Sequence, residues 1–155
     1  MNIFILDNDP VKAAQLQCDK HIPKMVVESA QMLSTVHRMI DGVMERRPSK
    51  SGSMLQYFKL DDYREDILYK AVHMNHPCTV WAAKSHENLA WLIRHGFALC
   101  DEYRHRYEKD HACMKGLEVA ENIFATKSGK EISIYKNVVE FTRAMPDEFK
   151  FDTSI

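Results

Sequence analysis

Apolar residues along this chain recur mainly at the three- and four-residue spacing that places them on one face of an amphipathic helix. The clearest example runs from Ile22 to Ile40, where apolar side chains share one face and polar ones such as Glu28 fall on another. Asp9-Pro10 marks an earlier helix start, because aspartate accepts hydrogen bonds from free N–H groups and proline fits the first helical position. The pattern predicts helices over about 10–18, 22–41, a stretch capped by Asp61-Asp62, 78–110 with a break near Ser85 or Gly96, and 111–125.

Four stretches do not follow this periodicity. Residues 2–6 are apolar, and since a lone strand has no sheet to join, we expect an extended segment tucked against the core. Residues 42–58 are basic, polar and rich in helix breakers, which predicts a mobile basic loop. Residues 132–142 form a short apolar element, and residues 144–155 predict a surface tail. The expected fold is all-α, with one compact helical domain over residues 1–155 and an extended N-terminal segment.

Composition agrees with a helical globular protein. The chain has 155 residues, enough for one well-formed core, and its 45% hydrophobic and 28% charged residues exclude a disordered chain. Only 5 glycines and 5 prolines favour long regular elements. The formal net charge of −1 argues against a dedicated duplex-DNA binder with a broad basic field, although 8 histidines can gain charge near neutral pH.

The cysteines and the N-terminus indicate the compartment. The 4 cysteines include no tight C-x-x-C pair, which favours free, reduced thiols. Asp7 and Asp9 lie where a secretory signal would need a basic region followed by an apolar run. No window approaches the roughly 18 uninterrupted apolar residues of a membrane span. We therefore expect a cytoplasmic protein without a membrane partner.

The segment around Pro23 carries the most chemistry. Proline belongs in the first turn of a helix, so Lys20, His21 and Lys24 are expected where a helix begins. Free backbone N–H groups and nearby cations make such a place suitable for a phosphate, with His21 available for proton transfer. The alternative is an ordinary solvated helix corner.

A second cluster surrounds Pro77. Asn75 and His76 interrupt a helical pattern and could project into a cleft, and Trp81 follows one turn later, where it could stack on a base. The alternative is that Asn75 caps the next helix, His76 is a satisfied buried imidazole, and Trp81 belongs to the core, as large apolar residues mostly do.

Other chemistry is less specific. Histidines and cysteines occur near one another in several places, but none matches a paired zinc signature, so no metal site is predicted. No cofactor is expected, because there is no Gly-rich phosphate loop, nucleophile elbow or dinucleotide fingerprint. The basic stretch Arg46–Lys50 is interpreted as a solvated loop or, alternatively, as a flap that contacts a nucleic-acid strand.

The first of these clusters resembles the phage-encoded pyrimidine-dimer DNA glycosylase/AP lyases of the endonuclease V type. That family has Ala-Asp-Gln near its N-terminus, followed by a basic–acidic–Leu-Pro-Arg corner, and here Ala13-Ala14-Gln15 leads to Lys20-His21-Ile22-Pro23-Lys24. Asn75-His76-Pro77, Trp81 and the stretch 89–100 are similar in order and spacing to later family segments, so the resemblance covers roughly residues 1–110. Cys-Asp-Lys-His, Asn-His-Pro-Cys and Met-Pro-Asp-Glu are also similar to a set of uncharacterised phage proteins.

The resemblance implies a division of roles among these residues. Lys20 and Lys24 match two family arginines that hold phosphates around the lesion, while His21 stands where the family has its catalytic glutamate. That glutamate assists an N-terminal amine, which attacks the sugar C1′ and forms an imine. Asn2 stands at the attacking position, although it is larger than the family's small residue, and removal of Met1 is not expected. The predicted catalytic residues are Asn2, Lys20 and His21, and the predicted substrate-binding residues are Lys24, Asn75, His76 and Trp81.

The leading hypothesis is a glycosylase/AP lyase-like protein that acts on DNA or a nucleotide near its N-terminus. The replaced glutamate keeps open a second hypothesis, a non-catalytic protein of the same fold that binds nucleic acid or a host protein. A helical metalloprotein is a third and weaker alternative.

Overall fold

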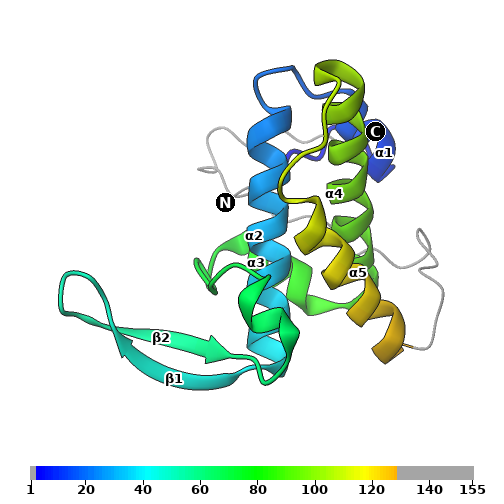
Figure 1. Cartoon of the computed structure of the whole chain (residues 1–155). Coiled ribbons are helices and arrows are strands. Elements are labelled where there is room, and N and C mark those ends of the chain that lie inside the picture. Colours follow the sequence, from blue (N-terminus) through cyan, green and yellow to red (C-terminus); the bar gives the residue numbers. More distant parts are fainter. Residues whose placement is uncertain (1–2, 129–155) are drawn as a thin grey trace, which may run out of the picture.

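The structure of this chain is a computed structural model, and it describes residues 3–128, with side chains described to residue 122 (Figure 1). Along the chain the elements are α1 (Pro10–Gln15), α2 (Ile22–Asp41), β1 (Val43–Pro48), β2 (Met54–Lys59), the 3-10 helix η1 (Tyr63–Asp66), α3 (Pro77–Lys84), α4 (His86–Tyr107) and α5 (Met114–Ser128). The predictions for Asn2, residues 132–142 and residues 144–155 lie outside the described residues, and the single domain over 1–155 stays a prediction.

Local capping chemistry fixes the helix boundaries, and most of them agree with the sequence prediction. Asp9 caps α1, since its Oδ1 accepts a hydrogen bond from the Val11 N–H at 2.9 Å. The predicted break near Ser85 is confirmed: this residue separates α3 from α4, and its Oγ accepts from the Asn88 N–H at 3.1 Å. Gly96 lies inside α4 instead, where a Cβ would come within 2.9 Å of Leu117 on α5. Gly96 therefore permits close packing of two helices and does not break one.

The all-α prediction is wrong, because residues 43–59 form an antiparallel hairpin where a mobile basic loop was expected. Its register pairs Val43 with Lys59 and Pro48 with Met54. The connecting turn is closed by hydrogen bonds from the Ser49 N–H to the Ser53 carbonyl at 2.6 Å and from the Gly52 N–H to the Ser49 carbonyl at 3.0 Å. Gly52 has φ +87°, a conformation that glycine adopts without steric cost. The helix-breaking residues between Ser49 and Ser53 therefore form the turn of a hairpin.

The helix predicted after Asp61-Asp62 is also mostly absent. Asp62 does cap η1, accepting from the Arg64 N–H at 3.0 Å, but residues 67–76 form no helix. The buried Arg38 side chain of α2 donates to the Leu68 and Tyr69 carbonyls at 2.9 and 2.7 Å. Arg38 therefore hydrogen-bonds carbonyls that would accept from backbone N–H groups if the helix continued.

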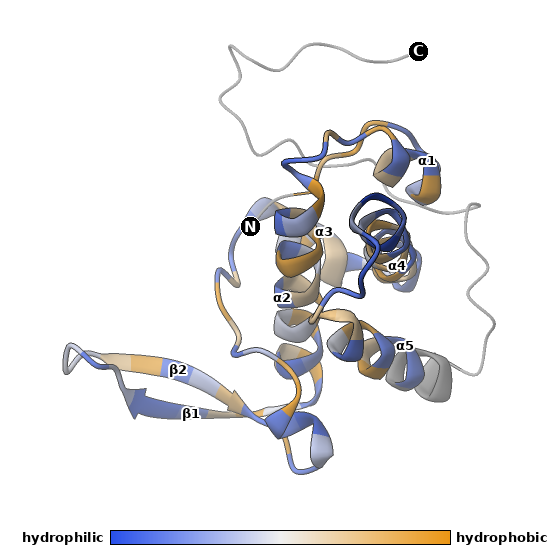
Figure 2. Cartoon of the chain, turned by 45° about the horizontal axis from the view of Figure 1, so that its top comes forward, coloured by the Kyte–Doolittle hydropathy of each residue, from blue (hydrophilic) through white to orange (hydrophobic). Residues whose placement is uncertain are grey.

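The core lies between α2 and α4, with α1, α3 and α5 around them. Ile3, Phe4 and Ile5 pack against it as an extended segment, which confirms the prediction for the described part of residues 2–6. Figure 2 shows α2 and α4 side by side. The largest fully buried apolar side chains include Trp91, Ile22, Met32, Leu33, Leu92, Ile93, Leu99 and Leu117. Among the described residues, no helix is long and apolar enough to cross a membrane.

Candidate functional site

The turn that leads into α2 is held in place from the end of α4. The Arg106 guanidinium donates to the Gln17 carbonyl at 2.7 Å, to the Gln15 carbonyl at 3.0 Å and to the Asp19 carboxylate at 2.9 Å. The Tyr107 hydroxyl donates to the Asp19 carbonyl at 2.8 Å. Because one planar cation joins three points of the turn, residues 15–19 have a defined path, and Lys20 follows directly.

The three predicted residues of the first cluster, Lys20, His21 and Lys24, all lie on the surface at the start of α2. Lys20 makes no hydrogen bond or ion pair within the described part of the chain. His21 precedes the first residue of α2 without a side-chain cap, and its ring lies 4.9 Å from the ring of Phe4. The Lys24 Nζ is 3.8 Å from Glu28 Oε1, and its side chain is 70% exposed. The site, called the α2 corner below, comprises Lys20, His21, Lys24 and Glu28.

The second predicted cluster reaches the same helix because residues 67–76 are fastened along it. The Tyr69 N–H donates to Ser34 Oγ at 3.2 Å, and the Val72 N–H donates to Thr35 Oγ1 at 3.1 Å. The segment therefore follows α2 towards its N-terminal half, and His76 arrives within electrostatic range of Glu28. Asn75 is exposed in the turn before His76 and makes no described hydrogen bond or ion pair.

His76 is the residue that caps α3. Its Nδ1 accepts a hydrogen bond from the Cys78 N–H at 3.2 Å, and Pro77 occupies the first helical position. Burial and the positive charge of His73 lower the pKa of His76, while the negative charge of Glu28 opposes that shift. Since Nδ1 accepts, the neutral ring carries its proton on Nε2, which leaves a donor for a ligand.

Glu28 is the residue that sequence reasoning missed. Its side chain is only 14% exposed, and its negative charge acts on His76 and on Cys78. Burial raises the pKa of Cys78, against a hydrogen bond from the Ile3 N–H that favours the thiolate. Ile3 thus contacts the start of α3, and the carboxylate of Glu28 lies within electrostatic range of the same residue of α3. The available signal was spacing: Glu28 lies four residues after Lys24 and seven after His21, on one helix face.

A further predicted substrate-binding residue, Trp81, belongs to the core. Trp81 is 3% exposed and packs edge-on against Trp91 in the core, with ring centroids 6.0 Å apart. Asn2 lies outside the described residues. Of the predicted site residues, Lys20, His21 and Lys24 lie together at the start of α2, and His76 lies within electrostatic range of Glu28 on the same helix.

Other possible ligand sites lie elsewhere or are not found. A cavity of about 300 Å³ opens at the far end of α2, where His37 and Asp41 face the α3–α4 junction at Lys84 and His86. Within residues 3–128 there is no group of three or more histidine, cysteine, aspartate or glutamate side chains that could hold a metal ion.

The fold is mostly helical, and exposed lysines beside a largely buried glutamate at the start of a helix suit a phosphate-bearing ligand. Comparison with known protein families identifies the family. Residues 1–115 match the family model described as pyrimidine dimer DNA glycosylase, so the chain belongs to that family. The matched region contains the α2 corner, α3 and the hairpin. No curated protein and no solved structure matches the chain.

Proposed function

We propose that this protein is a DNA glycosylase/AP lyase that acts on pyrimidine-dimer lesions at the α2 corner. The observation that carries the proposal is the largely buried Glu28, 3.8 Å from exposed Lys24 and within electrostatic range of His76, in a chain of the pyrimidine dimer DNA glycosylase family. Burial of the carboxylate to 14% exposure strengthens its effect on a nearby positive charge. The corner therefore supplies the anion that the replacement of the family's glutamate by His21 removes.

The exposed cations are suited to hold the DNA backbone. Lys20 and Lys24 lie on the surface at the positive end of α2, where a phosphate is favoured by charge. His21 lies between them, with one ring face covered by Phe4. In this proposal the two lysines bind phosphates that flank the lesion, and the damaged nucleotide is unstacked towards Glu28.

The chemistry follows from the amine that the family resemblance assigns to the start of the chain, at Met1 or Asn2. Its lone pair forms a bond to C1′ while the glycosylic bond breaks and the base leaves with the electron pair and gains a proton. Loss of the amine proton and opening of the sugar give an imine. Abstraction of a C2′ proton then expels the 3′ phosphate. Glu28 stabilises the cationic states, and His76 Nε2 or His21 moves the protons.

Borohydride trapping tests this proposal, because reduction of the imine leaves a stable covalent adduct. Wild type, a form with a chemically blocked N-terminus, and His21→Ala are incubated with duplex DNA that contains a pyrimidine dimer or an abasic site. We expect an adduct with wild type that disappears when the N-terminus is blocked, measured by gel shift and intact mass. A folded protein that binds the duplex but forms no adduct would instead indicate a non-catalytic nucleic-acid-binding protein.

A further inference from the structure

The hairpin, residues 43–59 and hereafter the hairpin arm, concentrates positive charge on a chain whose formal net charge is −1. It carries Arg46, Arg47, Lys50 and Lys59 against the single acidic residue Glu45. Figure 2 colours much of β1 as hydrophilic. Fixed positive charge on a projecting element attracts polyanions even where the whole protein is nearly neutral.

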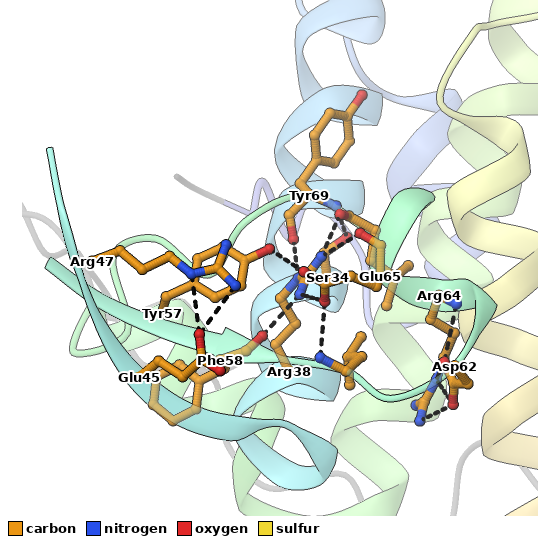
Figure 3. Close-up of polar contacts among 12 residues, drawn as sticks. Ser34, Arg38, Glu45, Arg47, Tyr57, Phe58, Asp62, Arg64, Glu65 and Tyr69 are labelled. Atoms are coloured by element: carbon orange, nitrogen blue, oxygen red, sulfur yellow. Dashed lines mark hydrogen bonds and ion pairs between the residues drawn. The ribbon is translucent and has the colours of Figure 1, made fainter. Parts of the chain in front are cut away.

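The hairpin arm is rigidly built at its base. All five N–H donors of Arg38 are used: they bind the carbonyls of Phe58, Leu68 and Tyr69 and both the carbonyl and the carboxylate of Glu65 (Figure 3). The Tyr57 hydroxyl also donates to the Glu65 carboxylate. Burial raises the pKa of Glu65, but hydrogen bonds from Tyr57, the Leu60 N–H and Arg38 outweigh it and bring the pKa down to about 2.

Close backbone packing stiffens the same junction. A Cβ on Gly42 would come within 2.5 Å of the Arg38 carbonyl oxygen and 3.0 Å of Phe58 Cβ. The backbone at Gly42, where α2 ends, therefore packs directly against Phe58 of β2, and no side chain fits between them. A positioned arm loses less conformational entropy on binding than a loose loop of the same charge would.

The basic side chains of the arm divide into a structural and an available group. Arg47 donates to Glu45 Oε2 at 3.1 Å and lies 3.6 Å from the centre of the Tyr57 ring, so it is held on one face of the hairpin. Arg46 pairs with Gln56 across the hairpin and so lies on the opposite face, and Lys50 lies in the turn. Within the described residues, Arg46 and Lys50 make no hydrogen bond or ion pair.

The arm leaves the C-terminal end of α2, and the α2 corner lies at the N-terminal end of the same helix. Figures 1 and 2 both show the hairpin leaving the end of α2 on the side away from α4 and α5, where residues 67–76 also lie. Arg38 at the arm's base is ten residues after Glu28, about 15 Å along a helix. Six-residue strands extend the arm by a further distance of about 20 Å. The arm tip is therefore at most about one duplex turn, roughly 34 Å, from Glu28.

We propose that the hairpin arm binds the sugar–phosphate backbone of duplex DNA about one helical turn or less from the lesion, with Arg46 and Lys50 on the phosphates. This inference rests on the proposed function, since the duplex is the substrate bound at the α2 corner. Met54, 56% exposed near the tip and on the same face of the hairpin as Arg46, would lie against a sugar. The excess of cations favours DNA over a protein partner.

Duplex binding by the double variant Arg46→Gln/Lys50→Gln tests the inference. The matched control is Lys109→Gln/Lys115→Gln, which removes two exposed cations from the α4–α5 side of the molecule. Dissociation constants are measured on lesion-containing duplex from 50 to 300 mM salt. We expect the arm variant to bind about tenfold more weakly than wild type near 0.1 M salt. The slope of its plot of log Kd against log salt concentration should be smaller than that of wild type by roughly two. The control should change neither quantity by as much as threefold.

Shortened duplexes locate the contact. When the DNA ends about half a turn from the lesion, first on one side and then on the other, one of the two truncations should remove the difference between wild type and the arm variant. Equal Kd values and equal salt slopes for the two proteins on the long duplex would overturn the inference, leave the proposed function intact, and favour a protein partner for the arm. A wild type that neither binds nor is trapped on lesion DNA would overturn both.

Discussion

The two ends of α2 both carry basic side chains and use them in opposite ways. At the start of the helix, the Lys24 side chain is 70% exposed and has only a 3.8 Å contact with Glu28. At the end, Arg38 is 1% exposed and donates five hydrogen bonds to the hairpin base and to residues 65–69. Charge alone therefore does not identify a binding residue. The cationic side chains that can bind a substrate are those that remain exposed to solvent in the folded protein.

The largest effect is expected at the buried end of the helix. Arg38→Met would leave the Glu65 carboxylate without its cation and four carbonyls without the donor they have in Arg38, and should lower the free energy of unfolding by about 3–5 kcal/mol. Lys24→Met, at the exposed end, should change it by less than about 1 kcal/mol. Urea unfolding of both variants measures the comparison. Similar losses in the two variants would contradict it.

The next effect concerns a buried histidine behind the α2 corner. His95 on α4 bonds the Pro10 carbonyl through Nδ1 at 3.0 Å and meets Gln17 Nε2 at 3.3 Å, so it joins α1 to α4. Burial lowers its pKa from 6.5 to about 4, although the bond to Pro10 favours the charged form. Below pH 6.5 the unfolded chain gains a proton that the folded chain does not, so stability falls between pH 6.5 and about 4.

The loss from this histidine should reach roughly 3 kcal/mol, measured by urea unfolding across that pH range. His95→Gln is the matched variant, since it removes the titrating ring and keeps a polar side chain. Its stability should be lower at pH 7 and should change less from pH 6.5 to 4. An unchanged slope in the variant would show that other groups cause the acid sensitivity.

A smaller effect is expected where α4 holds the turn before Lys20. Arg106→Lys cannot span the Gln15 and Gln17 carbonyls and Asp19 together, and should destabilise the fold by about 1–2 kcal/mol. It should also weaken lesion-duplex binding several-fold, because Lys20 loses its defined position. The control is Arg104→Lys, an exposed arginine on the same helix that pairs with Asp110. Equal binding by the two variants would argue that the turn needs no such support.

Features fixed by neighbouring residues were predictable from sequence. The caps at Asp9 and Ser85 and the end of α2 at Gly42 each depend on a few adjacent residues, and the structure has them where the sequence predicts them. The hairpin was missed because each strand is short and the turn is rich in helix breakers. Tyr57-Phe58, two residues that favour strands, with the glycine-containing turn before them, were the available signal.

The candidate site was predictable only in part, for a related reason. Lys20, His21 and Lys24 can be recognised from sequence because they lie within one short stretch around Pro23. Glu28 gains significance from His76, 48 residues later, and only the fastening of residues 67–76 to Ser34 and Thr35 brings them near each other. The sequence pattern at Trp81 fits either packing in the core or stacking on a base. In the structure Trp81 packs in the core.

The most direct test of the α2 corner is the single-turnover rate of glycosylic cleavage by Glu28→Gln on a duplex with one pyrimidine dimer. The substitution removes the negative charge, keeps the side chain's size, and leaves Lys20 and Lys24 to bind phosphate. We expect the rate to fall at least 100-fold. The Kd for the duplex should stay within about threefold of wild type, since the phosphate contacts remain. A rate within threefold of wild type would contradict a catalytic role for this carboxylate and place the chemistry elsewhere.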